Sequence, residues 1–280
     1  MDRSPVPHHA AMTAPRHEEF RPDVLSRRVV HRAWLTETRS PLDDFLIVPD
    51  GCVDLVYSDT GGLQLVGTMT SAQTLMLPGG VDIVGVRFQP GGAAPWLRAD
   101  MAGFTDKHLP LREVMGAAVV DWEDRLRATE DLRDRAQLLC AQVAGPMVSC
   151  WQQAHPRDLD LRRALDALVR AEGELSIEWL ALQCNLSTRQ FQRRCLAATG
   201  LPPKRLARVL RLMRSLRHRQ LTGAPWTAVA AECGFADQAH FTHDFTELVG
   251  CGPEAYAKRD GDVRFSQVRD NVRHVQSPIP

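Results

Sequence analysis

The sequence predicts a two-domain α+β protein. A small β-barrel or half-barrel with linker helices is followed by an all-α domain, in which a central helix joins two helix-turn-helix units. Three observations lead to this prediction. The chain has 280 residues, enough for two domains of about 100–150 residues each. Its first half alternates short apolar runs with turn clusters, and its last part contains a repeat with a period of 50 residues.

We expect four segments along the chain. Residues 1–22 are rich in Pro, His and Arg without apolar periodicity, which predicts a flexible tail, and residues 261–280 have the same character. Between the tails we expect a β-rich sensor and dimerisation domain with C-terminal helices over residues 23–150. A tandem helix-turn-helix domain is expected over residues 157–260.

Short apolar runs separated by turns characterise the first half. Four stretches have strand composition: "RVVHRAWLTET", "FLIVPDGCVDLVYSD", "LQLVGTM" and "TLMLPGGVDIVGVRF". Clusters of Pro, Gly and Asp lie within or between them at the spacing typical of a small barrel or sandwich. From Leu111 to about Met147 the apolar residues recur at helical spacing, which predicts one or two connecting helices.

The overall composition excludes some classes of protein. The formal net charge is zero, with 34 basic and 34 acidic residues, so the whole-chain charge indicates no anionic partner. No apolar run approaches the roughly 18 residues of a membrane span, and the N-terminus lacks the apolar region of a secretory signal. We therefore expect a soluble, cytoplasmic protein without a membrane partner. The seven cysteines form no CxxC pair, which favours reduced, mostly buried thiols.

The last part of the chain contains an internal repeat. The segment "EWLALQCNLSTRQFQRRCLAATG", residues 178–200, aligns with "AVAAECGFADQAHFTHDFTELVG", residues 228–250, at an offset of 50. Phe191 then matches Phe241, and Gly200 matches Gly250. Each unit has the pattern of a short apolar helix, a tight turn and a second helix of the same phase. This pattern predicts two helix-turn-helix units.

The second helix of each unit has one apolar stripe when its residues are spaced at about 100°. The residues expected to face inward are Phe191, Cys195 and Ala198 in the first unit and Phe241, Phe245 and Leu248 in the second. In the first unit Arg189, Gln192 and Arg193 face outward. Such residues suit reading of the major groove, because Arg can hold guanine bidentately and Gln can hold adenine. The alternative is that they are ordinary solvated surface groups.

The distribution of charge favours nucleic-acid binding. Ten basic residues and no Asp or Glu lie between Ser187 and Leu221. Within this segment, residues 204–221 are predicted to form one helix that joins the two units rigidly. Both second helices could then enter successive major-groove segments about 34 Å apart. Contacts to phosphates would position the pair. The expected phosphate contacts are Thr188, Arg194, Lys204, Arg208 and Arg211.

Two long motifs carry a resemblance to a known family. They are "LSTRQFQRRCLAATGLPPKRLARVLRLMRSLRHRQL" and "VAAECGFADQAHFTHDFTELVGCGPEAYAKR", and in the second a GF, an F-x-x-x-F and a G-x-x-P-x-x-Y occur together. Residues from about 161 to 259 thus resemble the AraC/XylS-type DNA-binding domain. The resemblance implies a seven-helix, two-unit domain that binds asymmetric sites on double-stranded DNA, often activating transcription through contact with RNA polymerase. The base contacts that it implies are Arg189, Gln192 and Arg193 in the first unit and Gln238, Ala239, Thr242 and His243 in the second.

The second unit departs from the common family pattern at two of these positions. His243 stands where a basic Arg is frequent, and Ala239 stands where a polar residue is common. We therefore expect the first unit to supply more of the sequence specificity.

The motifs "VPDGCVDLVY" and "IVGVRFQPGGAAPWL" resemble the β-rich, cupin-like N-terminal domain of one branch of AraC-type regulators. This resemblance implies a domain that senses a small molecule of unknown identity, with helices that could mediate a homodimer. Metal binding is not expected, because His31 is the only histidine from Val24 to Met101 and such centres need several convergent ligands. The candidate effector pocket consists of Trp34, Cys52, Asp54, Arg87, Phe88 and Trp96. Phe88 and Trp96 are equally consistent with ordinary core residues.

Two alternatives remain open from the sequence. The first is a DNA-repair enzyme that uses an AraC-type module, which would need clustered zinc-binding cysteines; Cys52 stands alone in the strand-rich region. No GxSxG, HExxH or P-loop motif occurs, so we expect no enzymatic activity and no cofactor. The second is a regulator whose N-terminal domain binds a protein partner instead of a metabolite.

Overall fold

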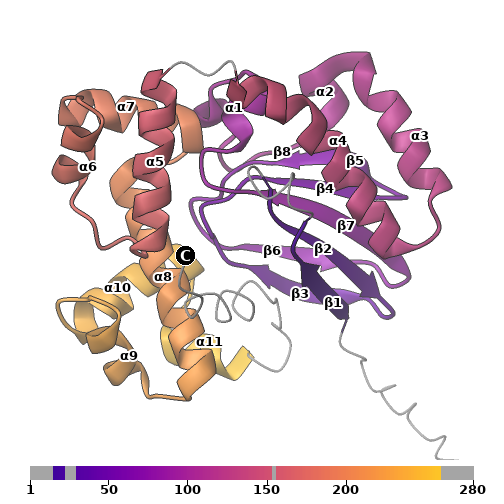
Figure 1. Ribbon diagram of the computed structural model, residues 1–280. Coiled ribbons are helices and arrows are strands. Elements are labelled where there is room, and N and C mark those ends of the chain that lie inside the picture. The colour runs from indigo at the N-terminus through magenta and orange to yellow at the C-terminus, as the bar shows by residue number, and fades with distance from the viewer. Residues whose placement is uncertain (1–14, 23–29, 153–155, 260–280) are drawn as a thin grey trace, which may run out of the picture.

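The computed structural model describes residues 15–22, 30–152 and 156–259. A β-rich domain and a helical domain lie side by side in it (Figure 1). This arrangement confirms the predicted α+β architecture. The C-terminal tail expected over residues 261–280 lies outside the described residues, as do residues 1–14 of the expected N-terminal tail.

The β-rich domain is built on a six-stranded antiparallel sheet with strand order β1-β2-β7-β4-β5-β8. A second sheet pairs β3 with β6. Within the described residues the larger sheet does not close, because β1 and β8 are its two edge strands. Of the two predicted forms, barrel and half-barrel, the sheet thus has the second. The strands are β1 (Arg16–Phe20), β2 (Val30–Thr38), β3 (Leu42–Ile47), β4 (Asp54–Ser58), β5 (Gly62–Val66), β6 (Gln73–Leu77), β7 (Val81–Phe88) and β8 (His108–Pro110).

The tail expected over residues 1–22 is wrong at its C-terminal end, because Arg16–Phe20 form edge strand β1. The sequence "RHEEF" has no alternation of apolar and polar residues, so the usual strand signal is missing. Its strand is stabilised by charge instead. Glu19 pairs in register with Trp34 of β2, and its carboxylate lies 3.6 Å from Arg87 and 3.8 Å from Arg32.

One face of the larger sheet is apolar and carries the domain core. Val84, Val86 and Phe88 of β7 are fully buried there, together with Leu55 and Tyr57 of β4. The long helix α4 packs across β2 and β7 on this face (Figure 1). The helical elements of this domain are α1 (Ala93–Leu97), η2 (Met101–Phe104), α2 (Leu111–Met115), η3 (Gly116–Val119), α3 (Val120–Ala128) and α4 (Leu132–Gln152). The expected one or two connecting helices correspond to α3 and α4, which follow the short helices α2 and η3.

The opposite face of the sheet holds a cluster of buried charges around Arg87. The guanidinium of Arg87 forms two hydrogen bonds with Asp54, at 3.1 and 3.0 Å, and lies 3.0 Å from Asp50. Glu19 and Arg32 complete the cluster. Three carboxylates therefore share two arginines in a place of low solvent access. Burial, opposed by Arg87, raises the pKa of Asp54 to about 6.

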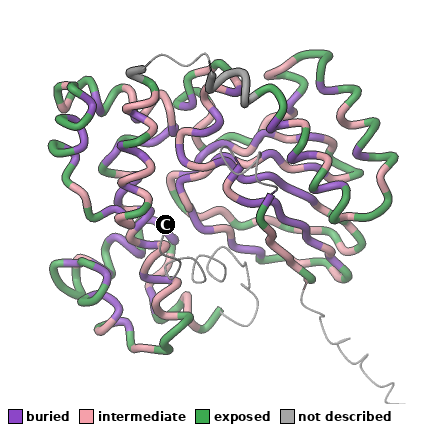
Figure 2. The backbone as a smooth tube through the Cα atoms, in the orientation of Figure 1, coloured by how far each residue is buried: buried purple, intermediate pink, exposed green. Residues whose placement is uncertain are grey.

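The helical domain contains seven helices within residues 156–259, as the family resemblance implied. Central helix α8 has eight buried residues along one side and contacts both units. Buried residues concentrate in α8, in the helices that face it and in the sheet (Figure 2). The helices are α5 (Pro156–Arg170), α6 (Ile177–Gln183), α7 (Thr188–Thr199), α8 (Pro203–Thr222), α9 (Trp226–Glu232), α10 (Gln238–Val249) and α11 (Pro253–Arg259). Helix α4 ends at Gln152 and α5 begins at Pro156, and we propose the domain boundary between them.

Removal of Arg87 should destabilise the β-rich domain strongly. Arg87→Ala leaves Glu19, Asp50 and Asp54 buried without their main counter-charge, and breaking such a buried pair costs about 3–5 kcal/mol. Urea titrations of the wild-type protein and the variant measure the change in the free energy of unfolding. Arg39→Ala is the matched control, since Arg39 is exposed in the same domain and should change this energy by less than about 0.5 kcal/mol. Equal effects of the two substitutions would contradict this account of the charged face.

Candidate nucleic-acid interface

Helix α7 is the second helix of the first unit and presents a polar surface. Ser187 caps its N-terminus in a capping box with Gln190, which satisfies free backbone N–H groups of the first turn. Phe191 and Cys195 are fully buried, as the helical phase predicted. Gly200 ends the helix in the left-handed conformation at φ 78°, which favours glycine. The outward residues Arg189, Gln192 and Arg193 are all exposed.

Helix α10 repeats this construction in the second unit. The carboxylate of Asp237 accepts a hydrogen bond from the backbone N–H of His240 at 2.7 Å, so Asp237 is the N-cap. Phe241 and Phe245 are buried and contact each other edge to face, with ring centroids 5.5 Å apart. Both also pack against Trp226 of α9. The predicted base contacts of this unit are exposed on its surface: Gln238, Ala239, Thr242 and His243.

Most of the basic residues of α8 are already paired within the domain. Arg214 pairs with Glu172 and Glu174, and Arg217 pairs with Glu172. Arg219 donates to the carbonyl of Ala224 at 2.6 Å. Towards the other end, Arg205 and Arg208 pair with carboxylates of α10. The basic segment seen in the sequence is therefore less available for phosphates than its composition indicates.

The residues predicted to contact phosphates differ in how available their side chains are. Lys204 is exposed and forms no ion pair with another described residue, so it remains available. Thr188 is half-buried in the first turn of α7. Arg194 lies 4.0 Å from Asp158, and the guanidinium of Arg211 lies 5.5 Å from the ring centroid of Phe235. Arg208 is directed at acidic residues of α10, an arrangement that differs from the one expected.

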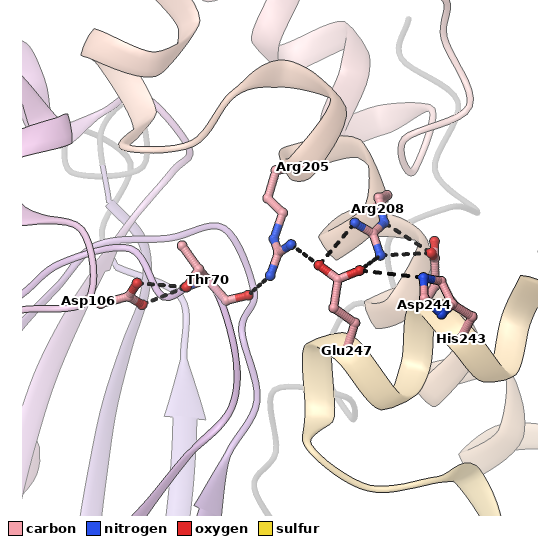
Figure 3. Close-up of polar contacts among 7 residues, drawn as sticks. All are labelled: Thr70, Asp106, Arg205, Arg208, His243, Asp244 and Glu247. Carbon is pink, nitrogen blue, oxygen red and sulfur yellow. Dashed lines mark hydrogen bonds and ion pairs between the residues drawn. The ribbon is translucent and has the colours of Figure 1, made fainter.

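A carboxylate pair on α10 provides these partners and was not predicted from the sequence. Asp244 is buried, and its Oδ1 atom lies 2.8 and 3.1 Å from two nitrogens of the Arg208 guanidinium. Glu247 binds both Arg205 and Arg208 (Figure 3). Hydrogen bonds from Arg208 and Arg205 lower the pKa of Glu247 to about 2, against the opposing effect of its burial. His243 Nε2 lies 4.0 Å from the same carboxylate.

The two second helices consequently differ in their available charge. Arg189 and Arg193 of α7 are exposed and form no ion pair or side-chain hydrogen bond with the described part of the chain. Helix α10 has no Lys or Arg, and its acidic residues are held by α8. Of these two helices, only α7 therefore carries positive charge that is free for an anionic partner.

The candidate effector residues separate into two groups. Trp34 pairs in register with Gly85, and Gly85 and Arg87 point to the same side of β7 because they are two residues apart. Trp34, Arg87 and its partner Asp54 therefore lie on the charged face of the sheet. Cys52 is near them, and burial raises the pKa of its thiol well above its ordinary value. These four candidate residues therefore lie close together.

Phe88 and Trp96 lie on the other side of the sheet, in the apolar core. Their ring centroids are 5.4 Å apart, and both are buried beneath α4 and its neighbours. They are core residues, the second of the two interpretations that the sequence allowed. A cleft of about 720 Å³ exists elsewhere, between α1 of the first domain and α5 and α7 of the second. None of the six candidate residues lines it.

The structure defines a tandem helix-turn-helix protein with a β-rich N-terminal domain. Each of its two units has a capped second helix with an exposed polar side, and central helix α8 joins the units. Residues 180–259 match the family described as "Helix-turn-helix domain", and residues 18–110 match the family described as "Domain of unknown function (DUF6597)". The match over residues 180–259 lies within the part of the chain that resembles the AraC/XylS-type domain, and it supports that resemblance.

Two curated relatives are activators of transcription by name. The chain is 32% identical over 161 residues to the HTH-type transcriptional activator RhaS of Pectobacterium atrosepticum, covering 56% of either protein. It is 36% identical over 92 residues to RhaS of Escherichia coli (strain SE11), covering 31% of this chain and 32% of that protein. The chain thus aligns with about half of the first relative's length and a third of the second's.

Solved structures show a weaker similarity. The DNA-binding domain of AdpA, solved in complex with a target DNA, has a TM-score of 0.34 and 25% identity, covering 36% of this chain and 95% of that one. ToxT from Vibrio cholerae O395 has a TM-score of 0.38 and 10% identity, covering 87% of this chain and 96% of that one.

No helix in the described residues is both long and apolar enough to cross a membrane. No group of three His, Cys, Asp or Glu residues in the described ranges has the geometry to hold a metal ion.

The pairing of Glu247 should make the helical domain sensitive to acid. The folded-state pKa near 2 lies below the ordinary value of 4.5, so the stabilisation is present above about pH 4.5 and is lost as the pH falls towards 2. Glu247→Gln should lower the free energy of unfolding by about 0.5–1 kcal/mol at pH 7, since solvent screens this half-exposed pair. Urea titrations between pH 7 and pH 3 should show the difference from wild type shrinking. Glu254→Gln, an exposed acid of α11, is the control; a difference for Glu247→Gln that does not change with pH would contradict the pairing.

Proposed function

We propose that this protein is a sequence-specific, DNA-binding regulator of transcription whose N-terminal domain responds to a small-molecule effector. The observation that carries the proposal is the exposed surface of α7. Arg189, Gln192 and Arg193 stand on a capped helix whose other side is anchored in the core, and no described residue pairs with the two arginines. A helix with this construction can enter a major groove and read base edges.

Similarity to transcriptional activators supports the same function. Both curated relatives that align with the chain are named as activators of transcription. Activation of transcription, contact with RNA polymerase and formation of a homodimer are part of the proposal on this basis. The alternative of a DNA-repair enzyme has no comparable support.

An effector is proposed to bind on the charged face of the sheet. Trp34, Asp54 and Arg87 converge there, and the indole N–H of Trp34 is buried without a hydrogen-bond partner. Buried polar groups are normally satisfied, so this unpaired N–H suggests a place for a polar ligand. A partner protein at this face is the alternative. A thermal-shift screen with metabolites tests the small-molecule version, because a ligand that binds only the folded state raises the melting temperature.

Substitution of the two free arginines should abolish specific DNA binding. DNA selected from random duplexes by the full chain provides the probe, and fluorescence anisotropy provides the affinity. Arg189→Ala with Arg193→Ala should weaken binding by on the order of 100-fold or more, because each lost bidentate base contact costs about 1–3 kcal/mol. The affinity of the wild-type protein should fall with rising salt, as phosphate contacts require.

The matched control removes the same charge from another surface. Arg39 and Arg112 are exposed in the N-terminal domain, and the double variant Arg39→Ala, Arg112→Ala should keep the affinity within about threefold. Equal losses for the two double variants, or wild-type affinity that is indifferent to salt, would refute the assignment of α7 as the reading helix.

The first unit should contribute more specificity than the second. Thr242→Ala with His243→Ala removes the strongest candidate readers of α10 and should cost less than about 10-fold, since neither residue offers a bidentate pair. Comparing the sequences selected by the two double variants measures this. When the arginines of α7 are removed, the selected sequences should become more variable in the half-site that α7 reads. A larger loss from the α10 variant would reverse the assignment.

A further inference from the structure

Both recognition helices, α7 and α10, end against one part of the N-terminal domain. This part consists of residues 67–72 and residues 104–107, which we call the docking loops. Two backbone hydrogen bonds join the loops, from Gly67 to Lys107 at 2.9 Å and from Asp106 to Thr68 at 3.0 Å. The Asp106 carboxylate also accepts from the backbone N–H and the hydroxyl of Thr70, at 2.7 and 2.6 Å. The docking loops therefore form one braced surface.

The docking loops donate hydrogen bonds to the C-terminal end of α7. The Thr68 hydroxyl donates to the carbonyl of Thr199 at 2.6 Å, and both residues are buried. The Thr105 hydroxyl donates to the carbonyl of Gly200 at 2.8 Å. The last carbonyls of a helix have no partner within the helix, so these hydroxyls satisfy groups that otherwise need water.

The same surface reaches the C-terminal end of α10. The backbone N–H of Ala72 donates to the carbonyl of Leu248 at 2.7 Å, in the last turn of that helix. The Ala72 side chain packs against the apolar core of the helical domain. One braced surface thus holds the ends of two helices that are 50 residues apart in the sequence.

Arg205 of α8 joins the three parts. Its guanidinium donates to the carbonyl of Thr70 at 2.6 Å and pairs with Glu247 of α10 (Figure 3). Arg208 holds Glu247 from the next turn of α8 and also binds Asp244. The chain of contacts runs without a break from Asp106 in the N-terminal domain to the DNA-facing helix of the second unit.

Close packing leaves little freedom for sliding at this interface. A Cβ atom on Gly200, at the end of α7, would lie 2.8 Å from Thr105 Oγ1. A Cβ atom on Gly51 would lie 2.7 Å from a methyl group of Leu206 on α8. Leu46 and Val48 of the β-rich domain are buried in the core of the helical domain. Because packed interfaces of this density are not continuously deformable, a shift of the docking loops would move the helix ends with them.

We propose that the docking loops, acting through Arg205, set the position of α10 relative to α7 and so select the spacing between the two DNA half-sites. Arg205, Thr68 and Thr105 are thus positioning residues that act without touching DNA. The inference rests on the proposed function for its DNA readout. It also identifies the route by which a change in the N-terminal domain reaches the second recognition helix.

Half-site spacing gives the first test, with the full-length protein and DNA that the wild type selects. One base pair is inserted between the half-sites, which displaces one from the other by about 3.4 Å and about 34°. The wild type should lose on the order of 30-fold in affinity on insertion, because its two helices are held rigidly. Arg205→Ala and the double variant Thr68→Val, Thr105→Val should lose less than about fivefold, because α10 can then follow the shifted half-site.

Lys204→Ala is the matched control for charge. Lys204 is exposed next to Arg205, and its substitution removes one positive charge but no ion pair or side-chain hydrogen bond with the described residues. It should weaken binding to both DNAs equally and leave the ratio of the two affinities unchanged. Far-UV circular dichroism confirms folding of every variant. The proposal would be overturned if the Arg205 and threonine variants lost as much affinity on insertion as the wild type does. It would also be overturned if Lys204→Ala lost less affinity on insertion than the wild type.

Hydrogen exchange without DNA gives a second and independent test. The amide of Ala72 and the last turn of α10 should exchange at least about 10-fold faster in Arg205→Ala than in wild type or Lys204→Ala. Unchanged exchange would overturn the proposal whatever the DNA result. If the wild type selects no DNA, the proposed function fails, and the exchange measurement alone then decides whether the docking loops hold α10.

Discussion

The helical domain depends on one helix that has to be apolar and strongly basic at once. Helix α8 buries one side against both helix-turn-helix units and carries an arginine near almost every turn. The apolar side supplies the stabilisation, because exposed ion pairs contribute only about 0–1 kcal/mol each. The arginines instead fix orientation. Glu172 and Glu174 meet one end of α8, and Asp244 and Glu247 meet the other.

This use of charge explains why a neutral protein has so concentrated a basic segment. Six of the ten basic residues between Ser187 and Leu221 lie within 4.0 Å of a carboxylate or carbonyl oxygen: Arg194, Arg205, Arg208, Arg214, Arg217 and Arg219. The carboxylates come from outside the segment, mainly from the α5–α6 connection and from α10. The charge left exposed on α7 is small in amount but unscreened by partners. The free positive charge of the segment is thereby reduced mainly to α7 and Lys204, and most of its other basic residues hold the domain together.

Local patterns in the sequence were sufficient to predict most helices and strands, but not the residues that pair between them. Helical phase predicted the buried faces of α7 and α10, because those faces are set by the 3.6-residue repeat of each helix alone. The pairing of Arg208 with Glu247 spans 39 positions and follows from the crossing of two helices, which no local pattern contains. Strand β1 was missed for a related reason: its Glu19 is buried by virtue of Arg32 and Arg87 on other strands. Phe88 fell outside the proposed pocket because adjacent strand residues point to opposite faces, which separates it from Arg87. Trp96 of α1 packs against Phe88 on that other face.

The unequal recognition surfaces and the domain interface have a common physical basis. A helix with few strong base readers can still contribute to specificity if its position relative to the other helix is fixed, because a rigid second contact excludes sites with the wrong spacing. Helix α10 is placed by its acidic residues, which α8 neutralises, and by a carbonyl that accepts from the N-terminal domain. Acidic residues on a DNA-facing helix would repel phosphates if they were free. Their pairing with Arg205 and Arg208 neutralises this negative charge and also holds the helix, so in the proposed function the same two arginines place the second unit and reduce its repulsion of DNA.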